Sequence, residues 1–163
     1  MPISRFAHSI QVGLSFGLVS GVITTLGLMV GLAFGTGSRL AVIGGIVTIA
    51  IADSCSDALG IHVSEEAEGV HDSSEIWMAT IATFLAKFVT AASFLIPLLL
   101  LELETAIRVS VGWGLAAVAG LSWVIARRQG GNGLRAVLEH VGVAAAVVVV
   151  TALLGRWVSD VFA

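Results

Sequence analysis

Charged residues and cysteine are both scarce in this sequence, and each scarcity excludes a class of protein. Only 12% of the 163 residues are charged, which is about half the share of roughly 25% found in soluble domains. The one cysteine, Cys55, rules out a disulfide within the chain. Together with 57% hydrophobic residues and a mean hydropathy of +1.02, the low charge excludes an ordinary soluble globular domain.

The hydrophobic residues form continuous runs, which is typical of a chain that crosses a membrane. A span needs about 20 apolar residues. Five runs reach that length, at residues 11–34, 40–61, 76–101, 106–126 and 136–158. Because the backbone finds no water to bond in lipid, each run must be an α-helix. We therefore predict an all-α integral membrane protein with five transmembrane helices, forming a single domain over residues 1–163.

The arginines give a weak prediction of orientation. With the N-terminus in the cytoplasm, the inner side carries Arg5, Arg127, Arg128 and Arg135, and the outer side carries Arg39, Arg108 and Arg156. Positively charged loops tend to stay inside, so we predict the N-terminus inside and the C-terminus outside. The first run is too long for a signal peptide, and no cleavage site is evident. We expect a prokaryotic cytoplasmic membrane.

Small residues recur every four positions along the first span. Gly13, Gly17 and Gly21 form one row, and residues 27, 31 and 35 form a second row of glycines. Such rows let two helix backbones approach closely. The first row suits packing inside one chain or an interface between two copies, and two rows allow both. Pro97 is expected to kink or loosen the last turns of the third span.

The second span ends in an acidic segment that contains no lysine or arginine. Asp53 and Asp57 are four residues apart and therefore lie on one helical stripe. We predict a helix that continues to about Glu68 and stops at Gly69, with an acidic cytoplasmic loop over residues 62–75. The side chains expected to attract cations there are His62, Glu65, Glu66, Glu68 and His71.

Ionisable residues inside a span cost about 2.5–3.5 kcal/mol each to insert and usually face a partner or a cavity. Asp53, Asp57, Lys87 and Glu139 need such an explanation, and His140 accompanies Glu139. One hypothesis is structural, with Lys87 neutralising one of the aspartates. The other is a cation path, because carboxylates with imidazole nearby are ligands for divalent metals and a carboxylate in an apolar site readily takes up a proton.

Four stretches follow one another along the chain: GLSFGLVSGVITTLGLMVGLAFG, then IGGIVTIAIADSCSDALGIHVSEEAE, then FLIPLLLLE, and finally LRAVLEHVGVAAAVVVVTALLG. In this order of segments the chain resembles the vacuolar iron transporter family. The LGIHVS segment at 59–64 is similar to the family's small residues, glycine and serine at the exit of the second span. The resemblance covers nearly the whole chain, although its motifs are mostly glycine and serine.

The resemblance implies a homodimer that exports Fe²⁺ or Mn²⁺ from the cytoplasm, with protons as the candidate coupling ion. The family's first span usually has an aspartate between serine and glycine, where this chain has Phe16. Its plant and fungal-type members insert a metal-binding domain where this chain has only residues 62–75. We therefore expect the acidic role to have moved to Asp53 and Asp57 as metal or proton sites, with Glu139 and His140 at the entrance and Lys87 as a counter-charge.

Other classes of function are less well supported by the sequence. No nucleophile–base set or cofactor motif is evident in the spans, so we expect neither an enzyme nor a bound cofactor. The partners expected are the lipid bilayer, the transported metal ion and a second copy of the chain, with no nucleic acid. The remaining alternative is a non-transporting membrane protein whose buried charges form a structural network.

Overall fold

The apolar runs all become helices in the computed structural model, which describes the backbone of residues 2–162 and the side chains of residues 7–162. The side chain of Arg5, counted above for orientation, lies outside the described side chains. In this part of the chain the helices are α1 (Pro2–Thr36), α2 (Arg39–Glu68), α3 (Ser73–Ser93), α4 (Leu95–Leu100), α5 (Leu103–Arg128) and α6 (Gly133–Phe162).

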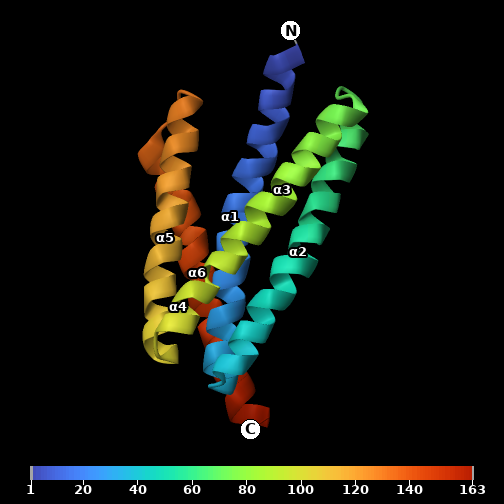
Figure 1. Ribbon diagram of the computed structural model, residues 1–163. Helices are drawn as coiled ribbons and strands as arrows, with labels where there is room; N and C mark the ends of the chain where they lie inside the picture. The colour runs from blue at the N-terminus through green and yellow to red at the C-terminus, as the bar shows by residue number, and fades with distance from the viewer. Residues whose placement is uncertain (1, 163) are drawn as a thin grey trace.

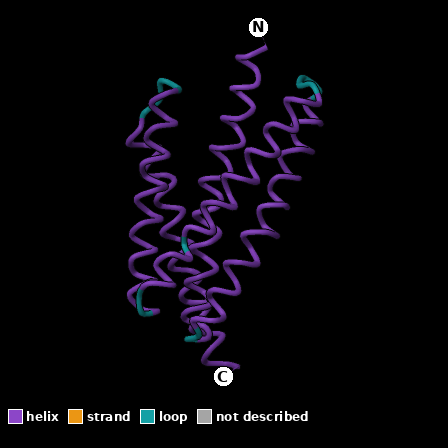
Figure 2. The backbone as a smooth tube through the Cα atoms, viewed as in Figure 1, coloured by secondary structure: helices purple, strands orange, loops and turns teal. Residues whose placement is uncertain are grey.

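The helices run up and down in a bundle with α1 near its centre (Figures 1 and 2). Helix α1 packs against α2, α3, α5 and α6. The N-terminus lies at one end of the bundle with the α2–α3 and α5–α6 loops, and the C-terminus lies at the other end (Figure 1). We call these the N-terminal end and the C-terminal end. Among the described side chains, Arg127, Arg128 and Arg135 lie toward the N-terminal end and Arg39, Arg108 and Arg156 toward the C-terminal end. Which end faces the cytoplasm stays a prediction.

Five segments of the described chain are long and apolar enough to cross a membrane, as predicted. They are Ala7–Thr36, Arg39–Glu68, Ser73–Leu100, Leu103–Arg128 and Gly133–Phe162. Each is longer at one end or both than the apolar run in the sequence, because the helices continue through polar residues at the ends. Many large apolar side chains on their outer surfaces are exposed, including Val149 and Leu153 of α6. A lipid environment suits such a surface.

The acidic segment after the second span is mostly helical. Helix α2 continues to Glu68 and is capped by Gly69, whose φ of 65° is the left-handed conformation that glycine adopts readily. Helix α3 begins with a capping box, in which the Asp72 side chain accepts from the backbone N–H of Glu75. The predicted stop at Gly69 is therefore confirmed, and the non-helical part of the predicted loop at 62–75 is only residues 69–72.

Pro97 interrupts the third span as expected. The helix breaks at Phe94, between α3 and α4. Proline has no N–H, and its ring crowds the carbonyl four residues earlier, which here belongs to Ser93. The backbone N–H of Phe94 bonds instead to the carbonyl oxygen of Ala91 at 3.2 Å, in a tighter turn. Helix α4 then continues the same span as far as Leu100.

Both rows of glycine in α1 are used within one chain. Gly13, Gly17 and Gly21 lie against the backbone of α3, and the second row lies against α6 around Thr151 and Gly155. A Cβ added at Gly17 would come within 2.6 Å of the carbonyl oxygen of Thr83, which is too close for any real contact. The glycines therefore bring the α1 and α3 backbones into direct contact, which sets the position of Lys87 on α3.

Candidate functional site

The first part of the site is the stripe of α2 that faces α1 and α3. Asp53 and Asp57 are separated by four residues, so one turn of helix places their side chains one above the other. Neither carboxylate is fully buried. The exposed fractions of the side chains are 30% for Asp53 and 21% for Asp57. The stripe predicted from the sequence is present. Side chains of α1 and α3 supply the polar partners of the two aspartates.

Helix α3 adds Lys87, whose side chain is only 2% exposed. Its ammonium nitrogen Nζ lies 2.6 Å from Oδ2 of Asp53 and also forms an ion pair with Oδ2 of Asp57. The structural hypothesis from the sequence paired Lys87 with one of the aspartates, whereas the structure pairs it with both. The lysine is thus held between two turns of the same helix.

Helix α1 completes the group with Ser20. Its hydroxyl donates to Oδ2 of Asp57 at 2.7 Å and accepts from Nζ of Lys87 at 3.0 Å. The sequence analysis did not identify Ser20. The available signal was a polar residue inside the first span, directly before Gly21, one of the glycines at which α1 lies against α3. We refer to Ser20, Asp53, Asp57 and Lys87 as the lysine cluster.

The charges of the lysine cluster do not balance. With all three ionisable groups charged, two carboxylates face one ammonium and the net charge is −1. A net charge inside a span is costly unless a proton, an ion or water compensates it. Asp53 also lines an open groove together with Thr24, Leu28, Ile49 and Ala52. The excess negative charge is therefore next to a surface from which a cation can approach.

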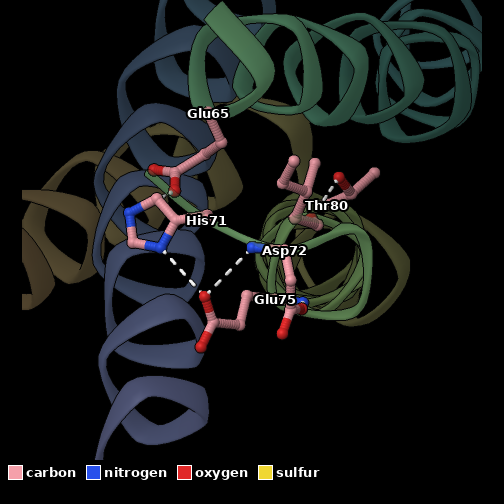
Figure 3. Close-up of polar contacts among 6 residues, drawn as sticks. Glu65, His71, Asp72, Glu75 and Thr80 are labelled. Carbon is pink, nitrogen blue, oxygen red and sulfur yellow. Dashed lines mark hydrogen bonds and ion pairs between the residues drawn. The ribbon is translucent and has the colours of Figure 1, made fainter. Parts of the chain in front are cut away.

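A second group of ionisable residues joins the end of α2 to the start of α3, at the N-terminal end of the bundle (Figure 3). Nε2 of His71 lies 3.4 Å from Oε2 of Glu65, and Nδ1 of the same ring lies 3.3 Å from Oε2 of Glu75. Glu75 is 2% exposed and also accepts from the backbone N–H of Asp72 at 3.3 Å. Glu65 is likewise buried. We refer to Glu65, His71 and Glu75 as the histidine cluster.

The remaining residues of the acidic segment are dispersed. His62 forms a hydrogen bond with the hydroxyl of Thr80 at 3.0 Å, and its ring meets the edge of Trp77. Glu66 and Glu68 are exposed at the end of α2. Glu65 and His71 were predicted from the sequence to attract cations together with these residues, and Glu75 was not among the predicted residues. The signal for Glu75 was its position three residues after Asp72, which marks the start of a helix.

Glu139 and His140 lie on α6 and have partners of their own. Glu139 accepts from the guanidinium of Arg135 at 2.8 Å, one turn earlier on the same exposed face. Nδ1 of His140 lies 2.8 Å from the hydroxyl of Ser122 on α5. Among the described side chains, no hydrogen bond or ion pair joins either residue to Asp53 or Asp57. The structure therefore does not unite them with the lysine cluster.

Phe16, which stands where the family resemblance leads us to expect an acid, is 42% exposed. It precedes Ser20 by four residues, so the two side chains share a face of α1. A carboxylate at position 16 would lie one turn from the lysine cluster. That Asp53 and Asp57 of α2 replace the missing acid stays a prediction.

The arrangement forms ion pairs and is not a complete metal site. Among the side chains of residues 7–162, no three His, Cys, Asp or Glu residues are grouped so that they could hold a metal ion. The fold and the cluster define a helical bundle with five membrane-spanning candidates and an unbalanced charge cluster inside it. Comparisons with protein-family models, curated proteins and solved structures found no match for this chain.

Proposed function

We propose that this protein is a membrane transporter that exchanges a cation for protons at Asp53 and Asp57. The observation that supports this most strongly is the unequal count of charges around Lys87, which forms ion pairs with both carboxylates. One lysine neutralises one carboxylate. The other carboxylate has no counter-charge within the cluster, and a site that can hold either a proton or a metal cation is suited to exchanging them.

Asp53 is the residue at which exchange would begin. Its side chain is the more exposed of the two aspartates, at 30% against 21%. It also lines the groove between α1 and α2. Asp57 has an additional bond from Ser20 and is held more firmly. In this proposal Asp53 takes the ion from the groove, and Asp57 and Ser20 provide further oxygen ligands.

The cation that we propose as substrate is a divalent transition metal, Fe²⁺ or Mn²⁺, leaving the cytoplasm. The resemblance of the first two spans to the vacuolar iron transporter family supports this choice, as do the carboxylate and hydroxyl oxygens, which suit Mn²⁺ and Fe²⁺. A homodimer, which the same resemblance implies, would supply ligands that one chain lacks. The acidic end of α2 would raise the local concentration of cations at the entrance.

Lys87 has a defined part in this mechanism. A dication between Asp53 and Asp57 balances both carboxylates and repels the ammonium, so Lys87 must withdraw from at least one of them. When the metal leaves, the ammonium returns and a proton neutralises the remaining excess charge. Metal release is thereby coupled to proton uptake.

Flux into proteoliposomes tests the proposal. We expect Asp53→Asn combined with Asp57→Asn to abolish proton-dependent uptake of Fe²⁺ and Mn²⁺, since neither amide can exchange a proton. Asp160→Asn is the matched control, because Asp160 is an exposed aspartate outside the cluster, near the end of α6. If the double variant folds and transports at the wild-type rate, the proposal is wrong.

A structural network is the second candidate, and the burial of Lys87 favours it. The ammonium is almost completely shielded and has ion pairs on both sides, as expected for a group that fixes the packing of α2 on α3. The combination Lys87→Asp with Asp53→Lys distinguishes the two candidates. A purely structural network tolerates exchange of the charges, whereas an exchange site loses flux because the groove now presents a lysine.

A further inference from the structure

A groove at the C-terminal end of the bundle, away from the lysine cluster, combines apolar walls with positive charge. Two adjoining hollows of about 430 and 510 Å³ share Phe34 of α1, Ile107 and Arg108 of α5, and Arg156 of α6. They form one continuous groove between these three helices. Neither hollow involves a residue of the lysine cluster or the histidine cluster.

The walls of the groove are aliphatic along the spans. The lining residues below the arginines are Val30, Val111, Val148, Val149, Ala152 and Leu153. From Val148 to Arg156 the groove follows α6 for eight residues, which is roughly 12 Å of helix. Val149 and Leu153 are 56% and 58% exposed, so this wall is open to the side, where lipid chains lie.

The charges lie at one end of the groove. The guanidinium of Arg156 is stacked over the ring of Phe34 at 4.7 Å and makes no ion pair with any described residue. Arg108 lines the same end and forms an ion pair with Glu104, one turn earlier on α5. The lining thus carries two arginines and one glutamate, with a net charge of +1, directly above an apolar channel.

We propose that this groove binds an anionic phospholipid from the leaflet at the C-terminal end. Guanidinium groups bind phosphate through two parallel hydrogen bonds, and basic pockets between transmembrane helices accept anionic headgroups. Arg156 and Arg108 bind the phosphate, and one acyl chain lies along the aliphatic wall of α6. The order of the lining, charged at the membrane surface and aliphatic toward its centre, matches the order of a phospholipid.

Native mass spectrometry of the detergent-purified protein tests the headgroup part of this proposal. We expect phosphatidylglycerol to be retained more strongly than phosphatidylcholine, and Arg156→Gln to weaken its binding by about tenfold, since a charge-assisted pair to phosphate is lost. The matched control is Arg127→Gln. Arg127 is stacked over Trp123 at 4.8 Å at the opposite end of the bundle, so it has the same kind of ring contact without the groove.

A second pair of variants tests the acyl chain and separates a lipid from free phosphate. Val149→Trp fills the groove, whereas Val150→Trp places the same bulk on an equally exposed neighbour, at 52%, that does not line it. We expect Val149→Trp alone to reduce binding of phosphatidylglycerol, with inorganic phosphate failing to compete. Equal effects of the two arginine variants, equal effects of the two tryptophan variants, or competition by inorganic phosphate would overturn the proposal. This result does not depend on whether metal is transported.

Discussion

Two regions of this molecule place one basic side chain between two carboxylates. In the lysine cluster, Lys87 of α3 lies between Asp53 and Asp57 of α2. In the histidine cluster, His71 lies between the last turns of α2 and the first turn of α3. Both clusters join the same pair of helices, one within the span and one at the N-terminal end.

The difference lies in the kind of base at the centre of each cluster. An unperturbed lysine keeps its positive charge well above neutral pH, whereas histidine is the side chain whose unperturbed charge change falls between pH 5 and 8. Burial adds to the contrast, since the side chain of Lys87 is 2% exposed and that of His71 is 18% exposed.

Removing the central base should have its largest effect in the lysine cluster. We expect Lys87→Met to reduce the free energy of unfolding by about 3–5 kcal/mol, the cost typical of a buried ion pair that loses one partner. Two carboxylates are then left facing each other without a counter-charge. Chemical unfolding in mixed micelles, followed by circular dichroism, measures the loss.

A triple variant is the control for this prediction. Lys87→Met combined with Asp53→Asn and Asp57→Asn removes both the base and the carboxylates, so most of the lost stability should return. If the triple variant is as unstable as Lys87→Met alone, the lost packing of the lysine side chain explains the effect, and the lost charge does not.

The two aspartates should differ from each other by a smaller amount. Asp57 accepts bonds from both Ser20 and Lys87, so we expect Asp57→Asn to cost about 2 kcal/mol, within the range for hydrogen bonds to charged groups. Asp53→Asn should cost about 1 kcal/mol, because Asp53 is more exposed and has Lys87 alone as its charged partner. The same unfolding measurement gives both values, and the reverse order would contradict the geometry.

The smallest effect is expected in the histidine cluster. His71→Gln should cost roughly 0.5–1 kcal/mol, because the ring is partly exposed and Glu75 keeps its bond from the Asp72 backbone. The change should be local, with faster hydrogen exchange of the amides at residues 66–76 and no change within the spans. Glu66→Gln, at an exposed glutamate nearby, is the matched control and should leave exchange unaltered.

Much of the fold follows from local properties of the sequence. The apolar runs require helices in lipid, Gly69 has no side chain to oppose a left-handed cap, and Pro97 cannot donate a backbone bond. Each of these features depends on residues close together in the chain. The helices that pack against the glycine rows of α1 could not be predicted in this way. A row of glycines accepts a helix of the same chain as well as a helix of another copy.

The candidate site was predictable only in part, for the same reason. The stripe of Asp53 and Asp57 follows from helical periodicity, and Lys87 stood out as a charge inside a span. Ser20 could not be identified, because its role depends on how α1 crosses α3. Glu139 and His140 were grouped with the aspartates by depth in the membrane, yet depth does not determine on which side of the bundle a residue lies.

The short connection between α2 and α3 also has a consequence for biogenesis. During translation, Asp57 leaves the ribosome 30 residues before Lys87, and α2 alone would carry two unpaired carboxylates into lipid at about 2.5–3.5 kcal/mol each. Only residues 69–72 separate the two helices, so α3 is available as soon as it is synthesised. We therefore expect the translocon to release α2 and α3 together, as a hairpin already closed by its ion pairs.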